Sequence, residues 1–473
     1  MDYRFGAGDH WISNVEIEVK DKVITAGAYK GKTIGVFGLA RTGIAAVHAL
    51  EASGAKVAAW DDNAERRAEV AGHLVNLYTA DLTHLDALLL APGIPLKPKP
   101  HTLVTMAQEA GTPVISDLDI FQAARNDMPQ NTAVAITGTN GKSTTTCLIG
   151  HMVDVCGGEV AVGGNIGTGI LSLDPLLEGG VYVFELSSFQ LDLAQDFCAE
   201  IAVLLNVTAD HLDRHGTFEN YLAAKKRLFD MQADDGIAVI GVDDQYGRAL
   251  ADELGDRAIR ISAETELDRG VYVAGGLLID AIDGEAKPVG DIRAAKALQG
   301  THNGQNAAAA YAVGRSLGFA SDMIFETLLS FSGLEHRQEV VAVVDGVRIV
   351  NDSKATNSDA AARALTSFDN IHWIAGGRAK EETFAHLDKF MGSVKACYFM
   401  GEAAGQLSGD LKPSHLTVSE TLAEAFNSAA KAAISGDTIL LSPACTAFDQ
   451  FANFEVRGRA FKGLVRKFEE GKA

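Results

Sequence analysis

Cysteine is scarce in this chain, and long hydrophobic runs are absent. Among its 473 residues are 5 cysteines, and no two of them form a Cys-x-x-Cys pair. This usage is typical of reduced thiols and argues against a disulfide framework or a cysteine zinc site. No segment approaches the ~20 uninterrupted apolar residues of a membrane helix, and residues 1–30 contain no apolar signal-peptide core. We therefore expect a cytoplasmic protein without a membrane span.

Positive charge is also in short supply. The chain has 41 Lys and Arg against 62 Asp and Glu, a net charge of −21, and no long basic run. Such a surface repels nucleic acid and anionic membranes, so neither is expected as a partner. A few well-placed cations must then meet any anionic small substrate, and we expect the protein to act on small molecules as a monomer.

The most informative stretch is residues 133–146, where a short β-branched apolar run breaks into a glycine loop and then a helix-like segment. Gly138 and Gly141 allow sharp turns, so that amide groups and the positive end of a helix can face an anion. Lys142 adds a full charge, and Ser143 adds a hydroxyl for Mg²⁺. The two glycines are separated by two residues, where the usual P-loop has four. A nucleotide triphosphate is the expected ligand, and an ordinary turn is the alternative.

The length predicts about three domains, and the apolar pattern predicts an α/β class. Between residues 33 and 125, short apolar runs alternate with helix-like stretches, as in a parallel sheet covered by crossover helices. Polar breakers near residue 130 and at 332–337 mark boundaries. We predict a Rossmann-like domain, a central P-loop ATPase domain and a second Rossmann-like domain at residues 1–128, 129–332 and 333–473. In the last domain, strands are expected at residues 340–350, 371–375, 395–400 and 437–441.

Loops of the first domain follow predicted strands at what would be one edge of its sheet. Gly38–Gly43 follows the strand at 33–37, and Asp61–Asp62 ends the next strand, a layout that resembles a dinucleotide-binding site. The first loop lacks the middle glycine of that fingerprint, which favours a uridine nucleotide or another diphosphate over NAD. Pro92–Gly93 begins a third loop at the same edge.

Possible metal ligands follow two buried strands of the second domain. Glu185 ends one strand, and Asp210, His211 and Asp213 follow another. These groups at neighbouring strand ends are typical of a Mg²⁺ site, and a solvated loop with a helix cap is the alternative. Lys225 lies among three consecutive cations on a predicted helix, which is usually a solvated face. A lysine directed at a metal would need its charge reversed chemically.

Polar segments also lie near and within the last domain. His302–Asn306 opens an alanine-rich helix with amides that can pair with a purine or cap the helix. Arg337 can reach a phosphate or hold the linker in a salt bridge. Three further polar loops, at residues 351–357, 376–380 and 442–449, follow predicted strands and are the expected walls of one pocket.

Eight ordered strings together resemble the Mur ligase family of ATP-dependent amide-forming enzymes, over nearly the whole chain. They are Gly-Thr-Asn-Gly-Lys-Ser-Thr at 138, Gly-Gly-Asn-Ile-Gly at 163, Glu-Leu-Ser-Ser-Phe-Gln-Leu at 185, Asp-His-Leu-Asp-Arg-His at 210, His-Asn-x-x-Asn at 302, His-Arg at 336, Asn-Asp-Ser-Lys-Ala-Thr-Asn at 351 and Leu-Ser-Pro-Ala-Cys at 441. The resemblance is closest to members that add D-glutamate to UDP-N-acetylmuramoyl-L-alanine in peptidoglycan precursor synthesis. It implies that ATP phosphorylates the substrate carboxylate and that the amino acid's amine attacks the acyl phosphate to form an amide.

The resemblance also implies how ATP and two Mg²⁺ ions are bound. Lys142, Asn165 and His211 would act at the phosphates and the reacting carboxylate, and Lys225 matches the family's carbamylated lysine. The implied metal ligands are Ser143, Glu185, His211 and Lys225. The implied nucleotide-binding residues are Gly138, Thr139, Asn140, Gly141, Lys142, Ser143, Thr144, Asn306, Arg337, Asp352 and Lys354.

For the two other substrates, the resemblance implies a further set of residues. Those for the UDP-muramoyl substrate are Arg41, Thr42, Gly43, Asp61, Asp62, Pro92, Gly93, Asn165 and Ser187. Those for the amino acid are Thr356, Lys380, Phe448 and Phe454. Ala447 stands where related D-glutamate-adding enzymes can have serine. Another Mur ligase or a folylpolyglutamate synthase would share the middle domain, and a nucleotide-dependent switch or UDP-sugar-binding regulator is the alternative that makes no amide bond.

Overall fold

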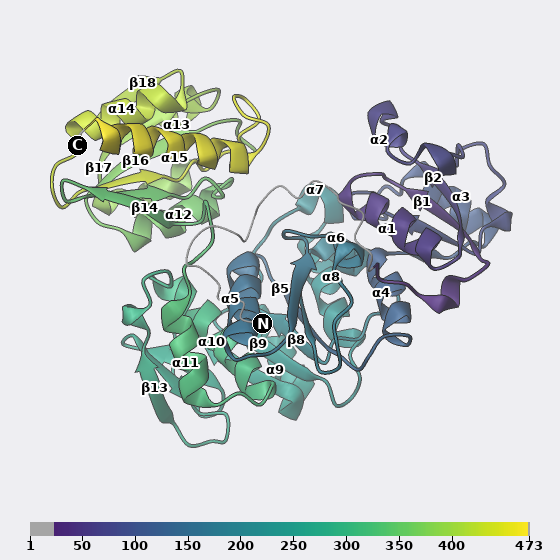
Figure 1. The fold of residues 1–473 in the computed structure, drawn as a ribbon. Coiled ribbons are helices and arrows are strands. Elements are labelled where there is room, and N and C mark those ends of the chain that lie inside the picture. The colour runs from purple at the N-terminus through teal and green to yellow at the C-terminus, as the bar shows by residue number, and fades with distance from the viewer. Residues whose placement is uncertain (1–22, 472–473) are drawn as a thin grey trace. The chain divides into compact units, whose positions relative to one another are not determined.

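The structure, a computed structural model, describes residues 23–471. Its strands form three sheets of four, nine and six strands, which confirms the predicted α/β class. The chain divides into two compact units, and Figure 1 labels the helices and strands along it. Unit 1 comprises the residues up to Gly290 together with Gln305–Thr327, and unit 2 comprises Asp291–Gly304 and the residues from Leu328 onward. Among the described residues, no helix is both long and apolar enough to cross a membrane.

The first sheet of unit 1 is parallel, in the order β2-β1-β3-β4. Its strands are Thr33–Phe37 (β1), Lys56–Trp60 (β2), Ala87–Leu90 (β3) and Val114–Ile115 (β4). The helices are Arg41–Ala52 (α1), Ala64–Ala68 (α2), Thr102–Ala110 (α3) and Asp117–Arg125 (α4). Because the strands are parallel, the loops after β1, β2 and β3 leave the sheet at one edge, as the sequence predicts.

The second sheet has the order β13-β12-β11-β10-β9-β8-β5-β7-β6. Its strands are Thr132–Thr137 (β5), Val160–Gly164 (β6), Val181–Glu185 (β7), Ile201–Leu204 (β8), Ile237–Gly241 (β9), Ala258–Ser262 (β10), Val271–Ala274 (β11), Leu277–Asp280 (β12) and Lys287–Asp291 (β13). The helices are Lys142–Val155 (α5), Ser188–Leu193 (α6), Leu212–His215 (α7), Phe218–Asp230 (α8), Gln245–Leu254 (α9), Thr301–Ser316 (α10) and Ser321–Ser330 (α11). Strand β5 pairs in parallel with both β7 and β8, so the segments that follow these three strands lie side by side.

The third sheet forms the centre of unit 2, in the order β14-β15-β19-β16-β17-β18. Its strands are Glu339–Val344 (β14), Val347–Asn351 (β15), Ile371–Gly376 (β16), Val394–Met400 (β17), Leu416–Ser419 (β18) and Thr438–Leu441 (β19). The helices are Ser358–Ser367 (α12), Ala404–Leu411 (α13), Leu422–Ala432 (α14) and Phe454–Glu470 (α15), with a 3₁₀ segment at Ala385–Ser393 (η7). The five neighbouring strands β15, β19, β16, β17 and β18 are parallel to one another.

The single strand predicted at residues 340–350 is wrong, because the structure has a hairpin there. Strands β14 and β15 pair antiparallel around Asp345 and Gly346, whose φ angles are 51° and 79°. A two-residue Asp-Gly turn has this left-handed backbone, and it matches the twist of the strands that it joins. The continuous apolar pattern concealed the turn.

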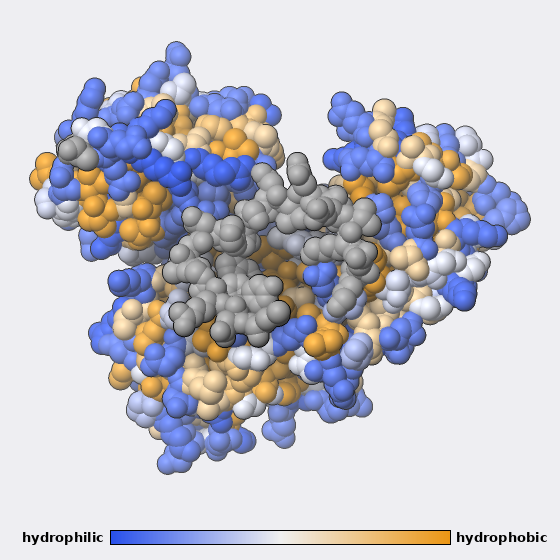
Figure 2. Space-filling model, viewed as in Figure 1, coloured by the Kyte–Doolittle hydropathy of each residue, from blue (hydrophilic) through white to orange (hydrophobic). Residues whose placement is uncertain are grey.

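Alternating side chains of the third sheet fill a separate hydrophobic layer on each of its faces. Trp373 packs in a layer with buried residues of α12 and α13, while the adjacent Ile374 packs with buried residues of α14 and α15. A sheet covered by helices on both faces is what near-continuous apolar strands require. Hydrophilic residues occupy much of the surface visible in Figure 2, and the exposed Val343 and Val418 lie on the outer strands β14 and β18.

Candidate active site

The loop after β5 has the geometry of an anion cradle. Gly138 and Gly141 have φ angles of 144° and 86°, which favour glycine. A Cβ atom at Gly141 would lie 2.4 Å from Oδ1 of Asn306, so a larger residue does not fit. Helix α5 begins at Lys142, directly after the loop. Its first turn and the positive end of its dipole therefore face the loop, as in helix starts that bind anions.

Two lysines meet at one oxygen of this loop. Nζ of Lys142 lies 2.9 Å from the carbonyl oxygens of Gly138 and Thr139, and Nζ of Lys225 lies 2.8 Å from the same Gly138 oxygen. Lys225 comes from α8, is 2% exposed and lies over the Tyr221 ring. Burial, reinforced by the charge of Lys142, lowers the pKa of Lys225 well below its usual value. Lys225 is thus not on a solvated face but is a buried amine that loses its proton readily.

The neighbouring Lys226 has the opposite environment. Its Nζ pairs with the Glu253 carboxylate at 2.6 Å, and its side chain is 36% exposed. The hydrogen bond with Glu253 raises the pKa of Lys226. Helix geometry separates the two lysines, because consecutive residues lie on different faces of α8.

Glu185 ends β7 beside the cradle and keeps one carboxylate oxygen unpaired. The side chain is 3% exposed. Its Oε1 accepts a hydrogen bond of 2.7 Å from Nδ2 of Asn165, whereas Oε2 is buried and has no hydrogen-bond partner among the described residues. A buried carboxylate oxygen without a donor is costly, and a cation or a ligand proton would satisfy it. The negative charge of Glu185 also acts on Lys225.

His211 lies after β8, in a strained turn that leads into α7. Its φ is 51°, and Nε2 lies 3.6 Å from Asp210 Oδ2. The ring packs edge-on against Phe189, with centroids 4.9 Å apart. Left-handed backbone in a non-glycine residue costs about 1–3 kcal/mol and is common at functional sites. The turn holds the imidazole at the same sheet edge as Glu185.

Tyr221, which the sequence analysis did not single out, joins the cradle to the His211 loop. Its hydroxyl lies 3.0 Å from Oγ1 of Thr139, and this Oγ1 accepts a hydrogen bond from the amide of Thr208 at 3.0 Å. Burial raises the pKa of the Tyr221 hydroxyl. The only sequence signal was its place on the helix that carries Lys225, one turn earlier.

Other predicted nucleotide-binding residues shape the cradle from within. Ser143 and Thr144 are buried in the first turn of α5, and the amide of Asn140 donates to Oδ1 of Asn206 at 3.0 Å. Asn306 lies behind the loop, where its Oδ1 accepts from Oγ1 of Thr145 at 3.1 Å. In this structure Asn306 therefore supports the cradle, and its predicted adenine contact stays a prediction.

The predicted loops of the first sheet come together at its carboxyl edge. Asp61 is 6% exposed, and its carboxylate accepts amide hydrogen bonds from Leu39 at 2.6 Å and Asn63 at 2.7 Å. A Cβ at Gly43 would lie 1.9 Å from the Gly38 carbonyl oxygen, so only glycine allows α1 to begin there. Asp61 thus braces the loop that precedes α1.

The exposed carboxylate of Asp62 lies beside aromatic groups. The Tyr78 hydroxyl donates to Asp62 at 3.0 Å. Burial, together with this hydrogen bond, raises the pKa of Tyr78 to about 12. Thr42 is the second residue of α1, and Pro92–Gly93 follow β3 in the adjacent loop. An exposed acceptor beside aromatic rings suits a nucleoside.

Two arginines join the first sheet region to the second within unit 1. Arg41, at the start of α1, donates to the carbonyl of Gly167. Arg214 of α7 donates to the carbonyls of Ile94 at 2.7 Å and Lys97 at 3.3 Å. The segment that carries His211 is therefore tied to the loop that contains Pro92–Gly93. Ser187, also predicted to bind substrate, caps α6 through the amide of Gln190 in this structure.

In unit 2, predicted residues gather around the loop after β15. The Asp352 carboxylate is 4% exposed and accepts from the Ser442 hydroxyl at 2.8 Å. Nζ of Lys354 lies 4.1 Å from the centroid of the Phe454 ring. Arg337 acts electrostatically on Asp352 and on His302, whose pKa burial lowers to about 4. Because His302 is neutral, it adds no positive charge to that of Arg337.

Arg457 is buried beneath the loops that follow β15, β16 and β19. It is 1% exposed and donates to the hydroxyl and carbonyl of Ser353 at 3.0 and 2.9 Å. The same guanidinium reaches the carbonyls of Gly376, Cys445 and Thr446 at 3.4, 3.1 and 3.3 Å. Sequence reasoning missed this residue, because an arginine within a helix as rich in charge as α15 is expected to face solvent.

The remaining predicted residues of unit 2 lie on those loops or next to them. Thr356 and the exposed Lys380 follow β15 and β16, and Phe448, which is 60% exposed, follows β19. Ala447 is buried. The adjacent Thr446 hydroxyl donates to the Arg378 carbonyl at 2.9 Å, so its proton is already committed within the protein.

Asp352 also provides a test of burial through the pH dependence of stability. Burial raises its pKa to about 7, against about 4 in an unfolded chain. Between these values the folded state holds a proton that the unfolded state has lost, so the stabilisation is present below pH 4 and is lost as the pH rises to 7. We expect the free energy of unfolding of the wild type minus that of Asp352→Asn to fall across this window, by at most about 1.4 kcal/mol per pH unit. Urea unfolding of both proteins at several pH values measures this difference. A difference that does not change with pH would contradict the raised pKa of Asp352.

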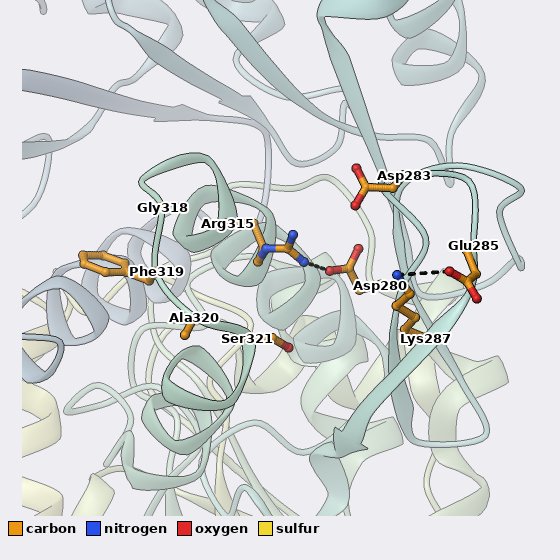
Figure 3. A pocket seen from close by; sticks show the side chains of 9 residues that line it. All are labelled: Asp280, Asp283, Glu285, Lys287, Arg315, Gly318, Phe319, Ala320 and Ser321. Carbon is orange, nitrogen blue, oxygen red and sulfur yellow. Dashed lines mark hydrogen bonds and ion pairs between the residues drawn. The ribbon is translucent and has the colours of Figure 1, made fainter.

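A separate hollow of about 500 Å³ lies near the β12–β13 end of the second sheet. Its side chains pair with one another: Arg315 with Asp280, and Lys287 with Glu285 at 3.1 Å (Figure 3). None of the predicted site residues lines it. The candidate active site is therefore the strand-end region around the cradle.

The chain is similar to known protein families and to curated relatives. The Mur ligase middle domain matches residues 136–314, and the Mur ligase glutamate ligase domain matches residues 336–445. The UDP-N-acetylmuramoylalanine--D-glutamate ligase of Phenylobacterium zucineum is 46% identical over 466 residues, covering 95% of this chain and 99% of its own length. The enzyme of the same name from Nitrobacter hamburgensis is 45% identical over 459 residues, covering 94% and 98%.

Solved structures show the same fold at lower identity. The UDP-N-acetylmuramate-alanine ligase MurC of Thermotoga maritima aligns with a TM-score of 0.56 at 17% identity, covering 93% of this chain and 100% of its own. MurF ligase of the same organism, in complex with ADP, aligns with a TM-score of 0.57 at 19% identity, covering 86% and 92%. With both domain models matched and curated relatives similar over nearly their full length, the chain belongs to the Mur ligase family.

Proposed function

We propose that this protein is an ATP-dependent ligase that joins D-glutamate to UDP-N-acetylmuramoyl-L-alanine, through an acyl phosphate, in peptidoglycan precursor synthesis. The relatives named above are UDP-N-acetylmuramoylalanine--D-glutamate ligases by name and match nearly the whole chain. The observation that carries the proposal is the cradle, where Lys142 and the buried Lys225 share the Gly138 oxygen. Both lysines act at the edge where the unpaired oxygen of Glu185 lies.

Three functional parts follow from this assignment. Residues 1–128 bind the UDP-muramoyl substrate, 129–332 bind ATP, and 333–473 bind the amino acid and contribute to the nucleotide site. In the first part, Asp61 braces the loop before α1 and Asp62 presents an exposed acceptor. Arg214 supports the proposal because it ties this substrate's loop to the His211 segment.

Members of the Mur ligase family use ATP, and the cradle suits its phosphates. Amide groups at the start of α5 and the Lys142 ammonium would neutralise and orient the transferred phosphoryl group. Asn165 and His211 would lie against the reacting carboxylate. Phosphorylation gives that carboxylate a leaving group, and most of the catalysis then comes from alignment and charge neutralisation.

The residues present fit Mg²⁺ if Lys225 carries a carbamate. Ser143, Glu185 and His211 offer oxygen and nitrogen donors, and Glu185 has its unpaired Oε2. Among residues 23–471 there is no group of three His, Cys, Asp or Glu side chains placed for a metal. A carbamate on Lys225 would supply a further anionic ligand and would remove the positive charge beside Lys142. Bound Mg²⁺ would withdraw charge from the phosphate oxygens.

The amino acid would be held in unit 2 by Thr356, Lys380, Phe448 and Phe454. Lys380 offers a cation for a carboxylate, and Phe454 is already placed under Lys354. Ala447 offers no hydroxyl, and the Thr446 hydroxyl donates to Arg378, so this chain would bind the side-chain carboxylate with one donor fewer than a serine-bearing relative.

Product analysis tests the proposal directly. Pure protein with ATP, Mg²⁺ and UDP-N-acetylmuramoyl-L-alanine should release phosphate in step with amide formation only when D-glutamate is added. Mass spectrometry of the product from a panel of D- and L-amino acids identifies the acceptor. Phosphate release that needs neither UDP-N-acetylmuramoyl-L-alanine nor D-glutamate would instead indicate a nucleotide-dependent switch. A product that contains another amino acid would indicate a different Mur ligase.

A further inference from the structure

Two of the proposed amino-acid-binding residues lie on separate loops of unit 2. Thr356 belongs to the loop between β15 and α12, and Lys380 belongs to the segment between β16 and η7. Their separation has to be fixed if both are to hold one small molecule, because a displacement of about 1 Å in a binding group is costly. Residues next to them in sequence provide the link.

Glu381, which follows Lys380, binds the start of α12 with both of its carboxylate oxygens. Oε1 accepts from the amide of Ser358 at 2.9 Å, and Oε2 accepts from the Ser358 hydroxyl at 2.5 Å. Ser358 is 3% exposed and is the first residue of α12, where the amide has no partner within the helix. The Glu381 carboxylate therefore acts as a helix cap supplied by another loop.

His386 completes this contact and constrains its protons. Its Nε2 lies 2.8 Å from the Ser358 Oγ and 3.9 Å from Glu381 Oε2. The serine hydroxyl has one proton, which goes to the carboxylate, because an ionised carboxylate can only accept. Nε2 of His386 must then donate to the serine oxygen. A directed chain thus runs from His386 through Ser358 to Glu381.

The segment around Glu381 is held from its other side as well. The Glu381 carbonyl accepts from Nε2 of Gln406 at 3.2 Å, and the Phe384 amide donates to the Asp410 carboxylate at 2.7 Å. Both partners lie on α13. The Glu381 side chain, with His386, therefore reaches across to the start of α12 next to the Thr356 loop, while the backbone of the segment is fixed to α13.

We propose that Glu381, acting through Ser358 and supported by His386, is a positioning residue that sets the spacing of Thr356 and Lys380 for the acceptor amino acid. The inference rests on the proposed function, and it adds a specificity determinant that does not itself touch substrate. Loss of the contact should leave the nucleotide cradle of unit 1 unaffected. The expected signature is weaker binding of one substrate out of three.

Steady-state kinetics of Glu381→Gln, with each substrate varied in turn, tests the inference. We expect the KM for D-glutamate to rise about tenfold, with the KM values for ATP and the UDP-muramoyl substrate within about twofold of wild type. Glu424→Gln is the matched control, because the Glu424 carboxylate also accepts from backbone at a helix start, that of α14. Its KM values should remain those of the wild type.

A double-mutant cycle shows whether Glu381 acts through Ser358. If it does, adding Ser358→Ala to Glu381→Gln should raise the KM for D-glutamate no further, and His386→Ala alone should raise it less than Glu381→Gln does. An unchanged KM in Glu381→Gln, equal rises for all three substrates, or additive effects in the cycle would each overturn the inference. Should Ser358→Ala fail to fold, Glu381→Gln decides alone, because that side chain is 29% exposed. Wild type without D-glutamate-dependent phosphate release would instead refute the proposed function.

Discussion

Replacing Lys142 by alanine is expected to lower kcat/KM at least about a thousandfold, or about 4 kcal/mol of transition-state stabilisation. The Lys142 ammonium is held at the cradle by the carbonyls of Gly138 and Thr139. It is therefore a cation fixed at the loop where the triphosphate is proposed to bind. Phosphate release measured over a range of ATP concentrations should show both a lower kcat and a higher KM for ATP.

Lys287→Ala provides the control for removing a lysine from the same unit. Lys287 lies on β13, is 61% exposed and pairs with Glu285, so its variant should turn over at the wild-type rate. Thermal unfolding of both variants separates loss of function from loss of fold. A Lys142→Ala protein that turns over ATP normally would show that the loop after β5 is not the phosphate site.

Much of the fold could be predicted because the strands are short, buried and separated by clear breakers. The strands at 33–37, 56–60 and 87–90 occur where the apolar runs lie. The prediction failed at the β14–β15 hairpin, although Asp345-Gly346 is a strong local turn signal. Apolar residues continue on both sides of that turn, and the run was interpreted as one strand.

The candidate site was predicted as a set of strand-end residues, and part of its physical basis is visible only in three dimensions. The sequence placed Glu185 and Lys225 in suggestive positions. It did not show that Glu185 has one unpaired oxygen, or that Lys225 is buried while Lys226 is partly exposed. Burial of one lysine among three depends on how α8 packs against the sheet.

Two residues that act by supporting loops, Arg457 and Glu381, were missed. Arg457 lies in a helix rich in charge, and three of its five hydrogen bonds reach Ser353 and Gly376, far away in sequence. Glu381 likewise has no local pattern that distinguishes it from a solvated glutamate. Such residues are recognised only when their partners are known, because their role lies in long-range contacts rather than in chemistry of their own.

Replacing Lys225 by alanine is expected to lower kcat about a hundredfold, with partial recovery when short carboxylic acids are added. The low pKa of the buried amine leaves it neutral more often, and only a neutral amine can attack CO₂ to give a carbamate and a released proton. The carbamate turns a positive charge into a negative one beside Lys142 and Glu185. A small carboxylate that enters the space left by the side chain can supply the same charge.

Labelled bicarbonate gives a readout that does not depend on turnover. Wild type in ¹³C-bicarbonate should show a carbamate carbon signal by NMR that Lys225→Ala lacks. Lys226→Ala should retain both the signal and the activity, because Lys226 is partly exposed and pairs with Glu253, away from the cradle. A fully active Lys225→Ala protein, or an active wild type without the signal, would refute the carbamate and leave Lys225 an unmodified amine that interacts with Glu185 and Asp210.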